Sequence, residues 1–389
     1  MFRGLRIGTV IAAAALCMTA PTANAAAKAS AQGVVDLPTA IKAWKVKPKK
    51  DETTQSMEKR VRKDLNTLFS SDRKKLEEDG AHWKLLSYLH EMPWDRLPEK
   101  WRAWYLETMP NPRLTEEQRA AFIERIKNKP TYKMTPKEVD VYLAYAQKEY
   151  PNIRDRVVHF ARRNIGQPYK IYLLGEFPNE IYDDQPLYIL GCSDCVVFAE
   201  HNYAMALSSD WKQFFATLQK IRYKNGEIGM TTRNHYTEAD WDKNNSWLVQ
   251  DVTKDLGATT VTKYTEKIDR AAFFAKFGIG QDFKPEVLHD EYIPADAVPS
   301  VLDKLKDGDF VNVVRGQGEG VWVGHVGLIG HDKDGKVMFI HSTPPTVKEQ
   351  PIMGYVEENL KKNPKRLRDG KAVFLGFKFL RLKEDAKPK

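Results

Sequence analysis

Cysteine is scarce in this sequence of 389 residues, which contains only Cys17, Cys192 and Cys195. A framework of disulfide bonds is therefore excluded, and an ordinary hydrophobic core must stabilise the fold. The 42% content of hydrophobic residues is sufficient for such a core. The chain has no second cysteine pair to complete a zinc site, and no internal repeat is visible. We expect neither a metal nor a cofactor.

Long hydrophobic runs are also lacking. The run at residues 7–18 is well short of the ~20 residues that a membrane-spanning helix needs. It follows Arg3 and Arg6 and precedes an Ala-Asn-Ala tripeptide at 23–25, which is the order of a secretory signal peptide and its cleavage site. Residues 1–25 are therefore predicted to be a signal peptide. We expect an exported protein, periplasmic or secreted, with no integral membrane segment after cleavage.

Charge of both signs is plentiful, but 61 basic residues exceed 52 acidic ones, and the formal net charge is +9. Basic and acidic residues are interleaved, and no arginine-rich arm or nucleic-acid motif occurs, so nucleic acid is not an expected partner. A basic exported protein suits an anionic partner such as a cell wall or a membrane surface.

The N-terminal third divides into two segments. Residues 26–52 are rich in Ala, Lys and Pro without a clear period, which predicts a linker. Residues 53–151 have a helical pattern, and Thr135 with Glu138 forms a capping box at one helix start. Four tryptophans gather here and indicate either the core of a small helical domain or an aromatic platform for sugars: Trp83, Trp94, Trp101 and Trp104.

Residues 152–389 are predicted to form a second domain. Helical patterns come first, and four strand patterns follow near the C-terminus at 309–314, 321–330, 337–342 and 373–382. Helices followed by consecutive antiparallel strands predict the α+β class.

The stretch YILGCSDCVVFAEHNYAMAL predicts a buried helix that starts at a cysteine. Ser193 or Asp194 can cap this helix, which places Cys195 in its first turn. Free backbone N–H groups and the helix dipole favour a thiolate there and are expected to lower the pKa of the thiol. A nucleophile needs that environment. A redox pair of Cys192 with Cys195, and a structural cysteine, remain alternatives.

Two histidines lie downstream on neighbouring predicted strands. Gly324 and Gly327 flank His325, and we expect them to clear space for a substrate backbone. A three-residue turn with Gly335 in the left-handed position would place His341 opposite Gly327. Both imidazoles would then share one face of the sheet, whereas a two-residue turn would put them on opposite faces. The sequence DKDG at 332–335 suits the three-residue turn, because it places Gly where φ must be positive.

The resulting hypothesis is a catalytic triad. Cys195 would be the nucleophile, His325 the general base and His341 the residue that holds the orientation and tautomer of His325. The backbone N–H of Cys195 and a neighbouring donor would hold the oxyanion. Such a site performs acyl transfer, and amide hydrolysis is the expected reaction.

The ordered motifs GQPY (166–169), DC (194–195), HVG (325–327) and FIHS (339–342) resemble the NlpC-type papain-like cysteine peptidases of cell-wall metabolism. Within that superfamily, DCVVFAEH, the segment IRYKNGEIGMTTRNHYTEADWDKNN and DVT resemble the N-acetylmuramoyl-L-alanine amidase-like branch. The resemblance covers roughly residues 152–382. Some members of this branch have Thr-Thr where this chain has Val196-Val197.

The resemblance implies a papain-like core and a peptidoglycan or muropeptide substrate. Carried over by position, Tyr169 and Asp194 would bind substrate near the thiolate, and Arg233 and His235 would line the cleft. Basic residues such as Arg233 suit a stem-peptide carboxylate. The expected reaction is cleavage of the muramoyl–L-alanine amide. A γ-D-glutamyl endopeptidase on the same fold and a non-catalytic cell-wall-binding protein are the alternatives.

Overall fold

The computed structural model describes most of the chain. The described residues are 36–388 without 79–80, 94–95, 97–99, 102–103, 105–115, 181 and 280–282. The predicted signal peptide lies outside them, so it stays a prediction.

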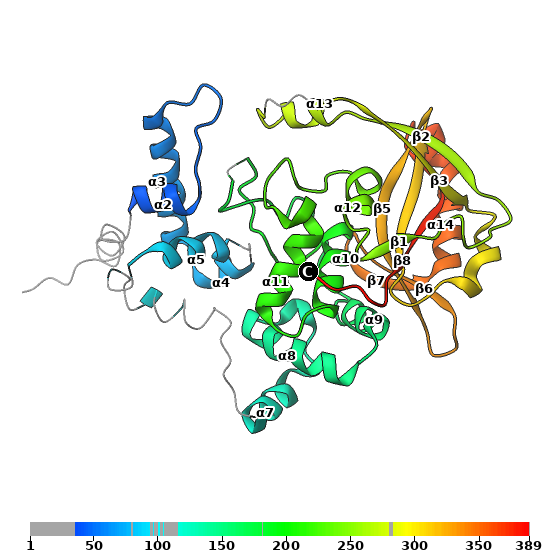
Figure 1. The fold of residues 1–389 in the computed structure, drawn as a ribbon, viewed down its shortest axis with the longest axis horizontal. Helices are drawn as coiled ribbons and strands as arrows, with labels where there is room; N and C mark the ends of the chain where they lie inside the picture. The colour runs from blue at the N-terminus through cyan, green and yellow to red at the C-terminus, as the bar shows by residue number, and fades with distance from the viewer. Residues whose placement is uncertain are drawn as a thin grey trace, which may run out of the picture.

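An antiparallel sheet of eight strands forms the centre of the molecule (Figure 1). Its order is β2-β3-β8-β4-β5-β6-β7, and β1 pairs with β8 beside this path. The strands are β1 (Val249–Asp251), β2 (Thr262–Ile268), β3 (Glu286–Pro294), β4 (Phe310–Gln317), β5 (Gly320–His331), β6 (Val337–Thr343), β7 (Thr346–Pro351) and β8 (Val373–Leu382).

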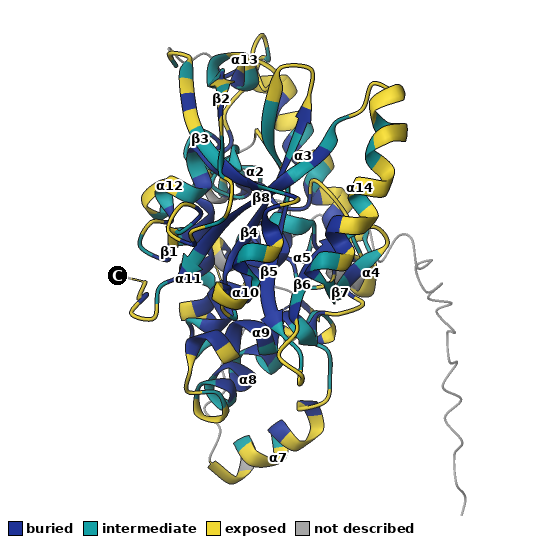
Figure 2. Cartoon of the chain, turned by 90° about the vertical axis from the view of Figure 1, so that its right-hand side faces the viewer, coloured by how far each residue is buried: buried dark blue, intermediate teal, exposed yellow. Residues whose placement is uncertain are grey.

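Helices cover both faces of this sheet, with α10 and α11 on one side and α14 on the other (Figure 1). Figure 2 shows that the central strands and α10 form the buried core. The longer helices are α3 (Thr54–Ser70), α5 (His82–Glu91), α7 (Glu116–Ile126), α8 (Pro136–Glu149), α9 (Ile153–Arg163), α10 (Cys195–Ala206), α11 (Trp211–Arg222) and α14 (Ile352–Arg368). The short ones are α2 (Leu37–Ala43), α4 (Arg73–Glu78), α12 (Asp242–Asn244) and α13 (Arg270–Ala275), with η2 (Thr131–Lys133), η3 (Lys224–Gly226), η4 (Thr237–Trp241) and η5 (Val298–Lys304).

The four predicted strands are confirmed as β4, β5, β6 and β8, and the mixed fold with an antiparallel sheet agrees with the expected α+β class. The sequence patterns did not predict β1, β2, β3 and β7. β2 and β3 extend from the sheet as a two-stranded ribbon, and α13 connects them (Figure 1). Most of their side chains are therefore exposed or only partly buried. Such strands lack the apolar signal of a core strand.

Two expected boundaries differ from the structure. Residues 37–46 of the predicted linker form α2 and the turn after it, and Trp44 is 1% exposed in a core shared with α3 and α5. The N-cap Asp36 and the packing of Trp44 explain this order. Helices α7 and α8, expected in the N-terminal region, pack instead in one hydrophobic core with α9–α11. The boundary at 151/152 therefore falls inside a shared core.

The tryptophans that the structure describes favour the core interpretation over a sugar platform. Trp101 and Trp104 are 7% and 3% exposed, and their rings meet edge to face at 5.5 Å. The side chains of Trp83 and Trp94 are not described. None of the helices that the structure describes combines the length and hydropathy of a membrane span.

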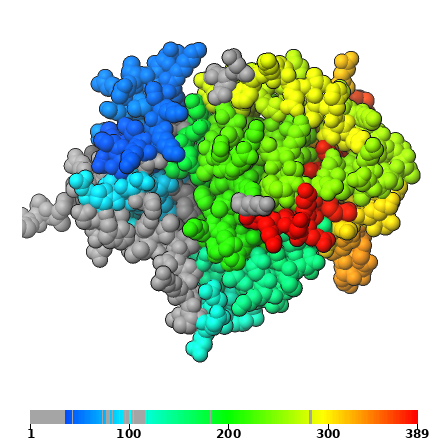
Figure 3. Space-filling view, viewed as in Figure 1, coloured from blue at the N-terminus to red at the C-terminus, as the bar shows by residue number. Residues whose placement is uncertain are grey.

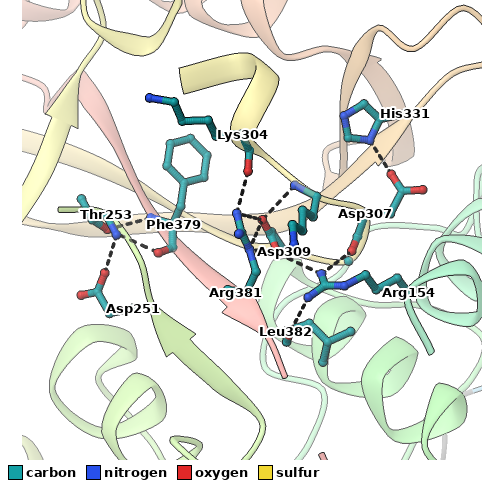
Figure 4. A network of polar contacts seen from close by, with 12 residues as sticks. Arg154, Asp251, Thr253, Lys304, Asp307, Asp309, His331, Phe379, Arg381 and Leu382 are labelled. Atoms are coloured by element: carbon teal, nitrogen blue, oxygen red, sulfur yellow. Dashed lines mark hydrogen bonds and ion pairs between the residues drawn. The ribbon is translucent and has the colours of Figure 1, made fainter. Parts of the chain in front are cut away.

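A buried polar network joins α9 to the C-terminal end of β8 (Figure 4). Arg154 Nη1 contacts the Asp309 carboxylate at 3.2 Å, and Arg154 Nη2 donates to the Leu382 carbonyl. Arg381 binds the other side of Asp309 at 3.0 Å. His331 at the end of β5 bonds Asp307 at 2.6 Å. These contacts hold α9 against the strands that carry the histidines.

Candidate active site

Asp194 is the N-cap of α10, and its carboxylate accepts the backbone N–H of Val197 at 2.8 Å. Cys195 is therefore the first residue of the helix, as predicted. The Cys195 thiol also meets the backbone N–H of Val326 on β5. Val326 directly follows His325, so the fold brings the candidate nucleophile next to the segment that carries the candidate base.

Side-chain hydrogen bonds connect three of the motifs. Ser193 Oγ donates to Gln167 Oε1 at 2.8 Å, and Ser342 Oγ donates to the Ser193 carbonyl at 2.9 Å. Gln167 also donates to the Leu190 carbonyl at 2.6 Å. All three side chains are buried. The loop before Cys195 is thus held between the GQPY segment and the strand end that carries His341.

The predicted register of the histidine hairpin is confirmed. Leu328 pairs with Ile340, and the next pair in this register is Gly327 with His341. The turn closes between Asp332 and Lys336, and Gly335 has φ +78°. His325 Nε2 lies 2.7 Å from His341 Nδ1.

This hydrogen bond leaves Nδ1 of His325 as its free ring nitrogen. The His341 ring stacks on Phe339 at 4.4 Å and meets Tyr355 of α14 edge to face at 5.4 Å. His341 is 1% exposed. Packing therefore fixes the ring that orients His325, which is what a positioning residue requires.

The two glycines beside His325 have a different role from the expected one. A Cβ on Gly327 would lie 2.5 Å from the Phe339 ring and 2.7 Å from the Ile340 carbonyl oxygen. Gly327 therefore makes room for the residue on which His341 stacks. Gly324 is the extra residue of a β-bulge, because Val323 pairs with Val314 while His325 pairs with Val313.

We expect Gly327→Ala to destabilise the protein by about 1–3 kcal/mol, because the new methyl group displaces Phe339 in a packed core. The loss of the Phe339–His341 stack should also lower activity. Urea unfolding measures the first effect. Gly354→Ala is the matched control: it lies inside α14 with ordinary contacts, and we expect a gain of about 0.5–1 kcal/mol. Equal stabilities of the two variants would contradict this packing role.

Burial dominates the protonation of the site. It raises the pKa of the Cys195 thiol to about 12, and the neighbouring Asp194 raises it further, whereas the N–H groups of Val326 and Val196 lower it. The expected lowering by the helix N-terminus is therefore outweighed by desolvation. Burial also lowers the pKa of His325 to about 3 and that of His341 to about 2. The site holds an uncharged thiol beside uncharged imidazoles.

A cavity of about 800 Å³ lies beside this site. Asp194 and Val196, the neighbours of Cys195, line one end of it. Its other walls come from the loop at 172–185, from the α13 region and from the N-terminal helices, which lie against the rest of the protein in Figure 3. Tyr169 is half-buried next to the cysteine, since burial and then Cys195 and Asp194 raise the pKa of its hydroxyl.

The N-terminal helices reach this cavity through Trp44 and Lys84. The Trp44 ring meets Phe177 edge to face at 4.9 Å, and Lys84 Nζ lies 4.4 Å from the centre of the same ring. Lys84 also contacts the Asp184 carboxylate at 3.8 Å. The N-terminal region thus builds one wall of the cavity.

Arg233 and His235 both line the cavity, as the resemblance implied. Arg233 is already balanced by two carboxylates, Asp183 at 2.9 Å and Glu176 at 3.3 Å. This pairing does not favour Arg233 as the anchor of a substrate carboxylate. His235 Nε2 bonds the Met230 carbonyl at 2.7 Å, and burial lowers its pKa to about 3. It supports the cavity wall as a neutral ring.

The sequence patterns did not reveal a buried ion pair in the wall of the cavity. Arg222 Nη1 donates to Glu200 Oε2 at 2.6 Å, and Trp241 Nε1 donates to Glu200 Oε1 at 3.2 Å. Glu200 was visible in the sequence as the single acid inside a mostly apolar helix. That signal indicates a buried partner, but it does not identify Arg222.

Cys192 lies away from solvent among apolar side chains, namely Leu173, Leu174, Ile189 and Val197. Burial raises the pKa of its thiol. Cys192 and Cys195 are both free thiols. The packing of Cys192 is that of a core residue, which disfavours a redox partner. Among the described residues, no three His, Cys, Asp or Glu side chains are grouped so as to hold a metal ion.

Comparisons with known proteins identify a family for this chain. A family model described as N-acetylmuramoyl-L-alanine amidase-like (AmiA-like) matches residues 159–361, more than half of the chain. A crystal structure from Legionella pneumophila has a TM-score of 0.54 and 18% identity, and covers 69% of this chain and 98% of that chain. An N-acetylmuramoyl-L-alanine amidase from Bacteroides uniformis has a TM-score of 0.46 and 22% identity, over 59% and 99%. No curated protein matches this sequence.

Proposed function

This chain belongs to the N-acetylmuramoyl-L-alanine amidase-like family, and on that premise we propose that it is a cysteine-dependent hydrolase of peptidoglycan fragments. Its preferred bond is the amide between muramic acid and L-alanine. The observation that carries the cysteine mechanism is the hydrogen-bonded pair of His325 and His341, 2.7 Å apart, next to a thiol at the start of α10. The core is of the NlpC, papain-like type.

Cys195 attacks the amide carbonyl carbon as His325 accepts the thiol proton at Nδ1. Because burial keeps both groups uncharged, this proton transfer accompanies the attack rather than preceding it. The Cys195 N–H stabilises the oxyanion. His325 then gives the proton to the departing amine, and a water molecule hydrolyses the thioester to release the carboxylic acid. His341 holds the His325 tautomer throughout.

The substrate lies in the cavity that begins at Asp194 and Val196. Its walls carry both signs of charge, including Lys49 and Arg60 from the N-terminal region and Asp184 from the facing loop. A peptide with free amino and carboxyl groups matches such a lining. The N-terminal helices therefore take part in substrate selection. Export to the periplasm or the cell surface, which the predicted signal peptide supports, brings the protein to this substrate.

Three other functions remain to be distinguished. A γ-D-glutamyl endopeptidase would use the same three residues on a bond inside the stem peptide. A non-catalytic wall-binding protein would bind peptidoglycan without cutting it, and the intact Cys195, His325 and His341 set disfavours this function. A redox protein would depend on Cys192, whose burial disfavours it.

We expect purified muropeptides to be cleaved by the wild type and by Cys192→Ala, but not by Cys195→Ala. The masses of the products identify the bond. A free peptide with N-terminal L-alanine indicates the amidase, whereas a sugar that keeps only L-alanyl-D-glutamate, with release of the rest of the stem peptide, indicates the endopeptidase. Binding without cleavage by the wild type would leave the wall-binding function. Loss of function only in Cys192→Ala would support the redox alternative, and full hydrolysis by Cys195→Ala would refute the cysteine mechanism.

A further inference from the structure

The β-bulge before His325 is held by a side chain from another element. Glu238 belongs to η4 and is 4% exposed. Its Oε1 accepts the backbone N–H of Val323 at 2.7 Å. Within β5, Val323 directly precedes Gly324, the extra residue of the bulge. The carboxylate therefore binds the strand where its register changes.

This position matters because the bulge decides which way His325 points. Successive side chains of a strand alternate between the two faces, so one residue more or fewer turns every later side chain to the other face. With Gly324 as the extra residue, His325 shares a face with His341. Bulges beside active sites re-aim side chains in this way. A contact that stabilises this bulge therefore also stabilises the orientation of the His325 side chain.

A second carboxyl group lies next to that of Glu238. Glu266 of β2 shares a hydrogen bond with Glu238. Its Oε2 is buried, and no N–H or O–H group of the described residues reaches it. Two ionised carboxylates in this position would repel each other, and a shared proton would remove that repulsion. In agreement, burial and then the bond to Glu238 raise the pKa of Glu266 to about 8.

The other charged groups around this pair come from β1, β2, β3, β8 and α12. Lys378 is the cation, and its Nζ contacts Asp290 at 2.7 Å, Asp251 at 3.2 Å and Asp242 at 3.4 Å. Tyr264 donates its hydroxyl to Asp290 at 3.3 Å. The positive charge of Lys378 is therefore shared by three acids, none of which belongs to the glutamate pair.

We propose that Glu238 is a positioning residue, which together with Glu266 clamps the β5 bulge and so directs His325 toward His341 and the Cys195 thiol. This inference rests on the proposed function, because it takes His325 as the base.

Three variants and a control test the clamp. Glu238→Ala removes the acceptor for β5. Glu238→Gln keeps an oxygen acceptor and adds an N–H that can donate to ionised Glu266. Glu266→Gln supplies an N–H donor to Glu238 that does not titrate. The control is Glu286→Gln on the same two-stranded ribbon, whose carboxylate binds Lys243 and Arg270 instead.

Two measurements are needed: kcat and KM on a muropeptide across neutral and alkaline pH, and the rate at which iodoacetamide alkylates Cys195, followed by peptide mass. Glu238→Ala should lower kcat on the order of 10²-fold with little change in KM, because the base is misplaced while the cavity is intact. Its alkylation at pH 7 should slow as well. Glu238→Gln, Glu266→Gln and the control should match the wild type at pH 7.

The pH profile separates the clamp from simple structural support. Wild-type kcat should fall as pH rises through about 8, because the two carboxylates of Glu238 and Glu266 then repel each other. Both glutamine variants should keep their kcat at pH 9, since an amide N–H replaces the lost proton. An unchanged kcat in Glu238→Ala, or the same alkaline fall in Glu266→Gln, would overturn the proposal.

Failure of the proposed function gives a different result. If the wild type hydrolyses no muropeptide, that function fails, and the clamp is then judged by alkylation alone. Equal alkylation rates for Glu238→Ala and the wild type would overturn it. If Glu238→Ala does not fold, as thermal melting would reveal, the pH profile of Glu266→Gln against the wild type decides.

Discussion

Replacing Cys195 by alanine is expected to lower kcat/KM for muropeptide hydrolysis by at least about 10³-fold, and His325→Ala should lose a similar factor. The first change removes the attacking sulfur, and the second removes the acceptor of its proton. With a thiol pKa near 12, almost no thiolate exists at neutral pH without that acceptor. The double variant should be no worse than either single one, because the two residues act as a unit.

His341→Ala should lower kcat/KM less, on the order of 10²-fold, because His341 acts through His325 rather than on the substrate. His331→Ala is the matched control. It is the last residue of β5, six residues beyond His325 on the same strand, and its imidazole bonds Asp307. We expect it to keep most of the activity. Initial rates on one muropeptide compare all of these variants. Activity of His325→Ala near the wild-type level would show that another group accepts the proton.

Glu200→Ala is expected to lower the free energy of unfolding by about 3–5 kcal/mol. Glu200 and Arg222 have side chains 3% and 6% exposed, and the guanidinium would be left as a buried charge without its 2.6 Å partner. Glu176 is a poor substitute, because burial raises the pKa of its carboxyl to about 7. Trp241 would also lose the acceptor for its indole N–H. Urea unfolding curves measure the loss.

A second variant and a control make this result specific. Glu200→Ala combined with Arg222→Met should be more stable than Glu200→Ala alone, because the unpaired charge is removed. Glu358→Ala breaks an ion pair with Lys362 whose side chains are 46% and 58% exposed, and should change stability by less than about 1 kcal/mol. A loss in Glu200→Ala no larger than in this control would show that water or Glu176 neutralises Arg222.

Most of the candidate site could be predicted from local sequence. Alternating apolar residues marked β5 and β6, and the Asp-Gly pair at 334–335 specified the turn that sets their register. The register then placed His325 and His341 on one face. An acid before an apolar run marked the start of α10, with Cys195 as its first residue. Each of these signals lies within a few residues of what it determines.

The parts that could not be predicted depend on residues far apart in the chain. Trp44 reaches Phe177, Glu238 reaches Val323, and Arg222 reaches Glu200 across elements with no shared pattern. The ribbon of β2 and β3 has polar strands, which look like loops when read alone. The direction of the pKa shift of the Cys195 thiol could not be predicted either, because it depends on how much protein surrounds the sulfur.

The sequence by itself determined the residue types of the site, their order and the elements that carry them, because helix caps, strand alternation and turn geometry act over a few residues. Only the tertiary structure decided how these residues are held and in which protonation state. Burial outweighs the effect of the helix dipole on the pKa of Cys195. Carboxylates from distant segments pair with Arg233 and bind the β-bulge that orients His325. Desolvation and packing depend on everything that surrounds a group, and that is established only when the chain folds.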